Sequence, residues 1–202
     1  MRLFSIRCLT AAAAVLIAPA FASAAIVVNI ASANRTISGS TQNFTLDVTF
    51  SNDGAAQNLI GYDTGLQISG GSGLTITGVG TGGNKVANPV LPSDPAFSAN
   101  SGNPYLISDA QSSAGTIDNG DGFFRILLQA APNTSGTFTI SFFQDEPNNN
   151  SGFDTKLYSN AQLNEVPNTT FGTGTVTFSP VPEPATLGLA MLGLPLILRR
   201  RR

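Results

Sequence analysis

Alternation of apolar and polar residues dominates the middle of the chain, between about residues 25 and 180. The clearest example is the heptapeptide Phe-Thr-Leu-Asp-Val-Thr-Phe at 44–50, in which every second side chain is apolar. A period of two places successive side chains on opposite faces of a β-strand, so one face is buried and the other meets solvent. The same alternation predicts further strands at 26–30, 138–142 and 176–178, and shorter candidates at 60–68, 74–79, 105–108 and 123–130.

Clusters of Gly, Asn, Asp and Ser separate these segments and are typical of turns. They lie at 51–54, 70–73, 118–122 and 132–136. Outside the two ends, no long segment has a convincing period of 3.6, so helices are not expected there. The pattern therefore predicts an all-β domain at 25–180, an antiparallel β-sandwich or jelly roll with about eight strands.

The first 24 residues follow another pattern. Arg2 and Arg7 flank a short basic start, an apolar run follows at 9–21, and Ala22-Ser23-Ala24 closes the segment. This order predicts a signal peptide at 1–24, an apolar signal helix that signal peptidase removes by cutting between Ala24 and Ala25. A buried N-terminal helix is the alternative, but it does not explain why small residues replace large ones at the end.

The last 22 residues have three parts in a fixed order. Val-Pro-Glu-Pro-Ala-Thr at 181–186 comes first, an apolar stretch predicts a transmembrane helix at 185–198, and four arginines end the chain. As a helix, 185–198 would span roughly 21 Å, which is short of the ~30 Å hydrocarbon core of a bilayer. By the positive-inside rule the arginines stay in the cytoplasm and leave the domain outside. These arginines are Arg199, Arg200, Arg201 and Arg202.

This tail resembles the PEP-CTERM sorting signal. The resemblance implies that an exosortase-type membrane protease processes the tail near the Pro-Glu-Pro motif and releases the protein to the cell surface or transfers it there. Pro182, Glu183 and Pro184 would then be recognised as substrate residues and would not be catalytic. A plain tail anchor that happens to carry a Pro-Glu-Pro stalk is the alternative.

Composition and charge exclude several classes of function. Between residues 25 and 181 the chain has four basic and eleven acidic residues, a net charge of −7. An acidic domain has no electrostatic footprint for nucleic acid, so we expect none as a partner. The chain has no histidine, and its single cysteine, Cys8, lies in the predicted signal peptide. Histidine-based catalysis, His-ligated zinc and thiol chemistry are thereby excluded from the domain. Calcium, polysaccharide or another protein fits better.

The Gly-rich turn at 118–122 carries the candidate metal ligands Asp118, Asn119 and Asp121. Carboxylate and carbonyl oxygens are what Ca²⁺ accepts, although the spacing does not fit an EF-hand. The same composition is also that of an ordinary turn, because Asp and Asn tolerate left-handed backbone conformations. Calcium is the only candidate cofactor, and the acidic loop at 145–154 has the same two interpretations.

An enzymatic role is the least favoured hypothesis. Asp145, Glu146 and Asp154 could be imagined as a glycosidase pair, but there is no tryptophan to stack on a sugar ring. The three tyrosines, Tyr62, Tyr105 and Tyr158, could form a modest sugar platform or lie at the edge of the core. We therefore expect no catalytic residues.

The domain itself resembles the cohesin-like branch of carbohydrate-binding β-sandwiches. The resemblance follows the order of a Phe-Thr-Leu-Asp-Val-Thr-Phe strand, a Gly-containing strand at 58–68 and a late Gly-led apolar strand at 122–130. It implies a dockerin as partner, and no residue here carries over as a dockerin contact. The resulting hypothesis is an exported cell-surface or extracellular-matrix protein with a non-catalytic β-sandwich. The alternative is a carbohydrate- or protein-binding module, with calcium stabilising a loop.

Overall fold

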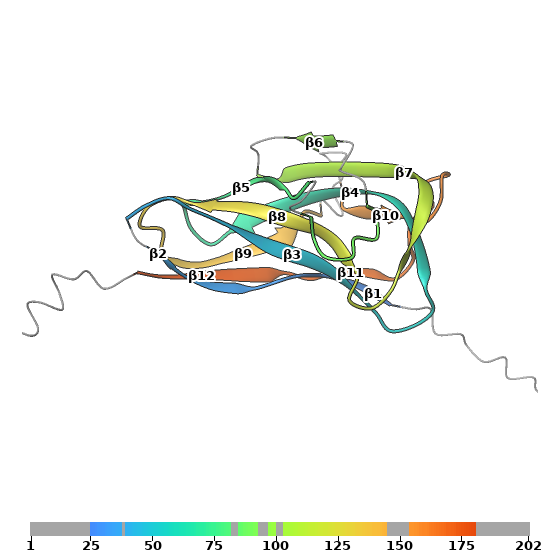
Figure 1. Ribbon diagram of the computed structural model, residues 1–202, viewed down its shortest axis with the longest axis horizontal. Coiled ribbons are helices and arrows are strands. Elements are labelled where there is room, and N and C mark those ends of the chain that lie inside the picture. Colours follow the sequence, from blue (N-terminus) through green and yellow to red (C-terminus); the bar gives the residue numbers. More distant parts are fainter. Residues whose placement is uncertain are drawn as a thin grey trace, which may run out of the picture.

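The computed structural model describes residues 25–37, 39–81, 85–92, 97–99, 103–144 and 154–180, and every regular element among them is a strand (Figure 1). The all-β prediction is thus confirmed for the described part of the chain. The helices predicted at 1–24 and 185–198 lie outside these residues. Within the described segments, no helix qualifies as a candidate to cross a membrane.

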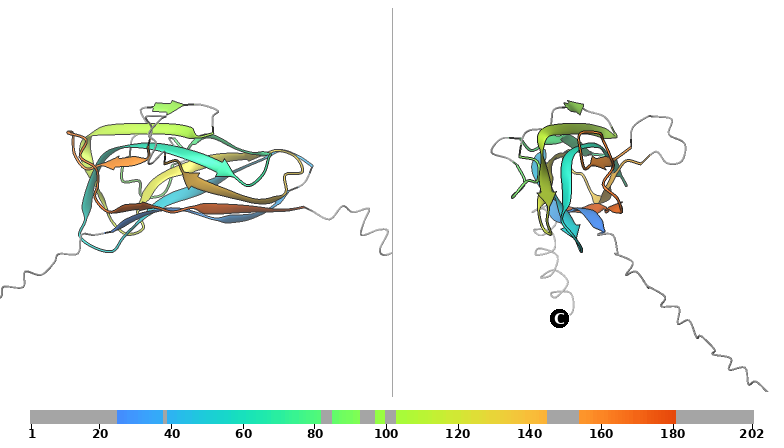
Figure 2. Two further views of the ribbon diagram at one scale, coloured as in Figure 1. Left: turned by 180° about the vertical axis from the view of Figure 1, so that it is seen from behind. Right: turned by 90° about the vertical axis from the view of Figure 1, so that its right-hand side faces the viewer.

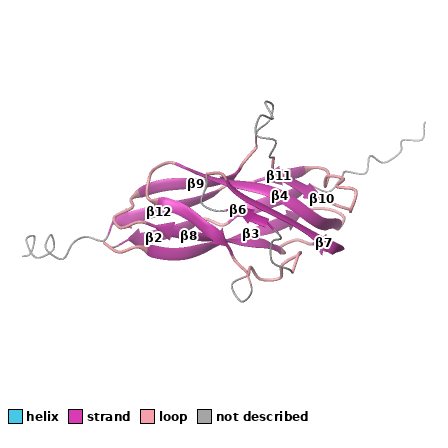
Figure 3. Ribbon diagram, turned by 90° about the horizontal axis from the view of Figure 1, so that it is seen from above, coloured by secondary structure: helices cyan, strands magenta, loops and turns pink. Residues whose placement is uncertain are grey.

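Two sheets pack face to face as a sandwich (Figures 2 and 3). The smaller sheet has the order β11 (Thr169–Phe171), β1 (Ile26–Ile30), β3 (Gln42–Asn52), β8 (Gly122–Ala130) and β5 (Leu74–Val79). The larger sheet has the order β2 (Ala33–Ile37), β12 (Gly174–Pro180), β9 (Gly136–Phe142), β4 (Gln57–Ser69), β7 (Tyr105–Ile117) and β6 (Phe97–Ala99). A short strand, β10 (Lys156–Tyr158), also pairs with β4.

The chain changes sheet twice at the same level of the sandwich. Residues 31–32 lead from β1 into β2, and residues 172–173 lead from β11 into β12. The two paths run side by side, because β1 pairs with β11 and β2 pairs with β12, both in parallel. The prediction of a wholly antiparallel sandwich was therefore wrong for these two pairs. Parallel neighbours need a long connection, and here nearly the whole domain provides it.

The alternating segments form the core as predicted. Inward-facing residues of β3, β8, β9 and β12 are almost completely buried, and Phe138 meets Phe178 edge to face with ring centroids 5.8 Å apart. The least exposed large side chains include Phe50, Phe138, Leu59, Leu66, Ile107, Ile126, Leu128 and Ile140. Burial of these apolar surfaces is the main stabilising contribution in a domain whose described part contains no cysteine.

Residues 85–92, where no strand was predicted, pack closely against β7 and β8. Val86, Val90 and Leu91 are buried in this segment. The amide of Val90 donates to the carbonyl of Gly122 at 2.9 Å, and the segment passes so close to β7 that a Cβ on Gly115 would lie 2.2 Å from the Val90 carbonyl oxygen. A glycine is therefore needed at position 115.

The domain is elongated, and the start of β1 and the end of β12 lie at opposite ends of its long axis (Figure 1). This follows from the strand directions, since the chain enters through β1 and leaves through β12, which continues parallel to β2. A tether attached after Pro180 would thus leave from the end opposite to Ala25.

Candidate functional site: the outer face of the five-stranded sheet

Arg125 and Asp47 lie at the middle of the outer face of the five-stranded sheet. They are cross-strand partners on β8 and β3, the strands flanked on both sides by others. The guanidinium donates twice to the carboxylate, Nε to Oδ1 at 2.5 Å and one terminal nitrogen to Oδ2 at 3.0 Å. Their side chains are 25% and 38% exposed. The hydrogen bond to Asp47 raises the pKa of Arg125 above its ordinary value, so the guanidinium stays charged.

Four nearby side chains are neutral and hydrogen-bonded. Gln129 Nε2 donates to Asn43 Oδ1 at 3.0 Å across β8 and β3. On β5, the hydroxyls of Thr75 and Thr77 donate to the carbonyls of Gln129 and Leu127 at 3.3 and 3.2 Å. We call the surface formed by β3, β8 and β5 around Arg125 the ion-pair face. Hydrogen bonds hold several of its side chains in place, which suits docking of another macromolecule better than chemistry on a small molecule.

The outer face of the larger sheet has a different character. Thr137 and Thr139 on β9 stand directly opposite Thr177 and Thr175 on β12. The hydroxyls of Thr137 and Thr177 are 3.1 Å apart. Cross-strand neighbours on β4 and β2 add further hydroxyl and amide side chains at Gln67, Ser69, Asn34 and Thr36. We call this surface the hydroxyl face. Neighbouring hydroxyls repeat at about 4.8 Å across strands and about 6.7 Å along them.

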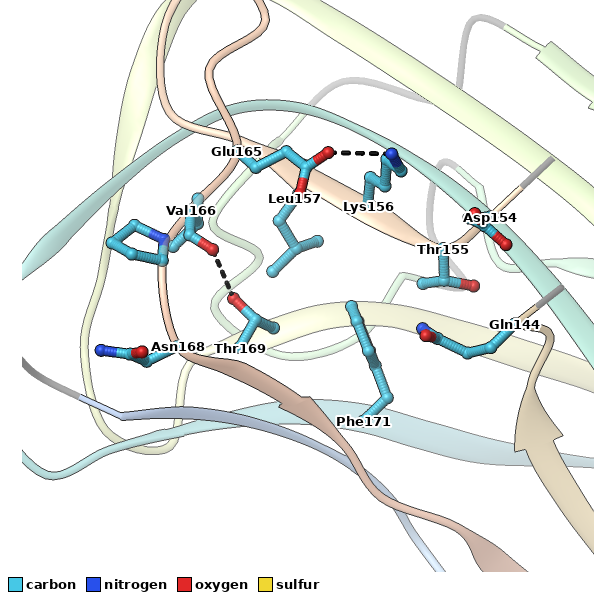
Figure 4. Close-up of a pocket in the computed structure, with 11 residues that line it drawn as sticks. Gln144, Asp154, Thr155, Lys156, Leu157, Glu165, Val166, Asn168, Thr169 and Phe171 are labelled. Atoms are coloured by element: carbon cyan, nitrogen blue, oxygen red, sulfur yellow. Dashed lines mark hydrogen bonds and ion pairs between the residues drawn. The ribbon is translucent and has the colours of Figure 1, made fainter. Parts of the chain in front are cut away.

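A third feature is an open cleft of about 350 Å³ between β10 and β11 (Figure 4). Leu157, Val166 and Phe171 provide its apolar surface, and Lys156 and Glu165 form an ion pair of 2.9 Å at its rim. Asp154, the one described member of the imagined glycosidase trio, lines the same cleft. Asp145 and Glu146 lie outside the described residues. The close-up shows Glu165 directed toward Lys156, and Asp154 on the other side of Lys156 from Glu165.

The predicted calcium ligands form a hydrogen-bonded turn between β7 and β8. Asp121 Oδ2 accepts the amide of Asp118 at 2.8 Å, and the amide of Gly120 donates to the carbonyl of Phe50 at 2.9 Å. Asn119 is exposed at the tip. No group of three or more acidic, histidine or cysteine side chains converges for a metal within the described residues. Calcium binding by Asp118, Asn119 and Asp121 stays a prediction.

The tyrosines do not form a sugar platform. Tyr62 and Tyr105 are buried in the core, each 3% exposed, so the interpretation as a shared platform was wrong. Burial, followed by the charge of Asp109, raises the pKa of Tyr62. Tyr158 is half-buried and donates to Asp63 Oδ2 at 2.8 Å. Burial, that hydrogen bond and the charges of Asp63 and Glu165 raise the pKa of Tyr158 to about 12.

The sorting residues Pro182, Glu183 and Pro184, the arginines at 199–202 and Ala24 all lie outside the described residues. Ala25 is described, and its backbone nitrogen donates to Asp53 Oδ1 at 2.9 Å. The structure therefore brings one predicted processing residue into contact with the domain.

Sequence reasoning missed the ion-pair face. The signal was present, because Asp47 and Arg125 are each the one charged residue in an otherwise uncharged strand, β3 and β8. Nothing in the sequence showed that the two strands are neighbours, since the residues are 78 positions apart.

Comparison with known proteins establishes the fold. No family model matches the chain, and no curated protein matches it. Among solved structures, a non-cellulosomal cohesin from the hyperthermophilic archaeon Archaeoglobus fulgidus aligns with a TM-score of 0.52 at 16% identity, over 83% of this chain and 98% of that one. The third ScaC cohesin of Acetivibrio cellulolyticus, solved with the ScaB dockerin, gives 0.54 at 16% identity, over 76% and 98%.

A third cohesin, the seventh type I cohesin of ScaB from Pseudobacteroides cellulosolvens, gives a TM-score of 0.52 at 14% identity, over 78% of this chain and 94% of that one. These proteins are aligned almost over their full lengths. The domain is thus a β-sandwich with the fold of these cohesins, and the prediction of a cohesin-like β-sandwich is confirmed.

Proposed function

We propose that this protein is exported, is sorted to the cell surface or extracellular matrix through its C-terminal tail, and there binds another protein through the ion-pair face of a non-catalytic β-sandwich. The observation that carries the binding part is the hydrogen-bonded face around Arg125 on a fold shared with cohesins, some of which were solved in complex with a dockerin.

Three properties favour the ion-pair face for a protein partner. Arginine is enriched at protein interfaces, and a bidentate pair can give one of its hydrogen bonds to a partner while keeping the other. Held side chains lower the entropic cost of binding. The acidic character of the domain, −7 between residues 25 and 181, favours a basic partner by long-range attraction.

The binding proposal is tested with a purified dockerin-type protein from the same organism. Arg125→Ala is expected to weaken binding at least tenfold, because truncating an interface arginine costs about 1–2 kcal/mol or more. Thr177→Val, on the hydroxyl face, serves as the matched control and should leave affinity unchanged. Equal affinities for the wild type and Arg125→Ala would assign binding elsewhere or to another partner class.

The sorting proposal is supported by the order of the Pro-Glu-Pro motif, apolar stretch and arginine cluster. In a host with its own exosortase, Glu183→Ala or deletion of 199–202 should leave unprocessed precursor in the inner membrane. Glu165→Ala, an acid at the cleft rim, is the matched control and should be processed normally. Release of both tail variants at the wild-type rate refutes the proposal.

A second candidate function is polysaccharide binding, which the hydroxyl face favours. Its threonines present neutral donors and acceptors in register on β9 and β12, as a neutral polyhydroxylated chain would need. Glycan arrays with and without a calcium chelator test it. Loss of glycan binding in Thr139→Val and Thr177→Val supports this candidate. If the chelator abolishes binding and the two substitutions do not, the turn at 118–122 is the binding site instead.

A further inference from the structure

The first residue of β1 is already paired with both neighbouring strands. Ile26 is already in register with Asn52 on β3 and with Thr169 on β11, and its amide donates to the carbonyl of Asn168 at 3.2 Å. Ala25 is therefore the last residue before the sheet. Its nitrogen lies 2.9 Å from Asp53 Oδ1.

The turn that carries Asp53 is itself held in place. Asn52 Nδ2 donates to the carbonyl of Ile117 at 3.1 Å, and Asn52 Oδ1 accepts the amide of Gly54 at 3.1 Å. Within the described segments, Asp53 makes no ion pair with a lysine or arginine side chain. A carboxylate is thus positioned at the start of β1, and its one described contact with a nitrogen is with Ala25.

The sequence places the signal-peptidase cut at the same residue. The Ala22-Ser23-Ala24 pattern predicts hydrolysis of the peptide bond between Ala24 and Ala25. Water adds hydroxyl to the carbonyl carbon of Ala24 and hydrogen to the nitrogen of Ala25, and the resulting amine takes up a proton. The nitrogen that was a neutral amide with one N–H becomes an ammonium group with three.

We propose that the α-ammonium group of Ala25, created by signal-peptide cleavage, forms an ion pair with Asp53 that fastens β1 to the end of the sandwich. This inference rests on the proposed export of the protein. Charge-assisted hydrogen bonds are roughly twice as strong as neutral ones, so the contact strengthens when the leader is removed. Maturation therefore stabilises the start of β1, and the precursor lacks this contribution.

The contact with Asp53 depends on the position of the cut. A cut after Ala25 removes the nitrogen that contacts Asp53. A cut one residue earlier moves the charge outward by about 3.8 Å, the spacing of consecutive Cα atoms. Only the cut between Ala24 and Ala25 places the charge at the carboxylate.

The test uses the full-length chain exported and processed in its host. Mass spectrometry identifies the N-terminus, and NMR titration then gives the pKa of the α-amino group. An opposite charge nearby favours the protonated form, so the pKa should exceed the ordinary value of about 7.7–8.0 by a few tenths of a unit to one unit. Asp53→Asn should restore the ordinary value, whereas Asp118→Asn, in the adjacent turn, should leave most of the shift in place.

Hydrogen exchange provides a second readout. Acetylating the α-amino group should accelerate exchange of the Ile26 and Val28 amides several-fold in the wild type and not in Asp53→Asn. A mature protein starting elsewhere overturns the inference together with the predicted cleavage site. A protein starting at Ala25 with an unshifted pKa, or with equal acetylation effects in both proteins, overturns the ion pair alone and leaves export intact.

Discussion

The amide of Thr175 donates to the hydroxyl of Ser32 at 2.9 Å, which joins the N-terminal and C-terminal segments of the domain across 143 positions of sequence. The bond lies where β1 gives way to β2 and β11 to β12. Just before it, the amide of Gly172 donates to the carbonyl of Val28 at 2.8 Å. The N-terminal and C-terminal segments thus change sheet side by side and are hydrogen-bonded to each other. Disruption of either segment at this point should destabilise both sheets.

Gly174→Ala tests this crossing. An added Cβ would lie 2.6 Å from both the carbonyl oxygen of Ala31 and Cγ2 of Ile30, so backbone must move. We expect a loss of about 1–3 kcal/mol in the free energy of unfolding, as for overpacking elsewhere. Urea unfolding measures it. Gly39→Ala is the control, because its nearest atom would be 4.0 Å away. If Gly174→Ala and Gly39→Ala were equally stable, the backbone around Gly174 would accommodate a Cβ without cost, which would contradict the prediction.

Phe138→Ala tests the core between the sheets. Phe138 is 1% exposed and packs edge to face on Phe178. Removal of a buried phenyl ring should cost about 3–5 kcal/mol, seen as a lower midpoint in urea with little change in slope. Leu163→Ala is the surface control, since Leu163 is 58% exposed. It should stay within about 0.5 kcal/mol of the wild type.

The Arg125–Asp47 pair should contribute little to stability, although it orders the ion-pair face. Both side chains are partly exposed, so solvent screens their attraction. A double-mutant cycle with Arg125→Met and Asp47→Asn should give a coupling energy of about 0.2–1 kcal/mol. Added salt should reduce this value. A coupling several times larger would mean that the pair is a structural anchor, which would weaken its assignment to binding.

Tyr158 should make the protein sensitive to alkali. Its pKa is raised to about 12, above the value of about 10 in an unfolded chain. A raised pKa means that folding favours the protonated phenol, so the stabilisation is complete below pH 10 and is lost as the pH rises through 12. Ultraviolet titration of phenolate and unfolding midpoints at several pH values measure the effect. Tyr158→Phe should lose less stability than the wild type between pH 10 and 12. If the two proteins lose the same stability, other groups cause the sensitivity to alkali.

The turn at 118–122 should hold its shape without calcium. Asp121 already accepts the Asp118 amide, so its carboxylate is engaged within the turn. We expect the melting temperature to be the same in chelator and in millimolar calcium, and Asp121→Asn to lower it equally in both. If calcium raises the melting temperature of the wild type but not that of Asp121→Asn, the turn is a calcium site after all.

Many strands could be predicted from the sequence because the pattern that marks a strand lies within the strand itself. The segment 74–79 was predicted with the same limits as β5, and 123–130 differs from β8 by one residue. By contrast, β7 continues to Ile117, well past the predicted end at 108, because its second half is polar and largely exposed. Strand β2 was missed for a similar reason, since only Ile37 in it is buried.

The candidate site could be predicted only in part. The sequence showed that Asp47 lies on the polar side of its strand, because apolar and polar residues alternate along β3, whereas Arg125 stands in the almost continuous apolar run of β8. It could not show that the two strands pair in the register that brings these side chains together. Sheet register depends on contacts between distant segments, and a shift by one residue would turn every side chain to the other face.

The sequence by itself determined the strand-forming segments, the acidic and histidine-free character of the domain and the predicted processing signals at both ends, because these depend on residue type and spacing alone. Only the tertiary structure decided which strands are neighbours, that β1 pairs with β11 and β2 with β12 in parallel, that Tyr62 and Tyr105 belong to the core, and that Ala25 meets Asp53. Each of these is a contact between segments far apart along the chain, whose loop-closure cost is offset only when the complete core is buried.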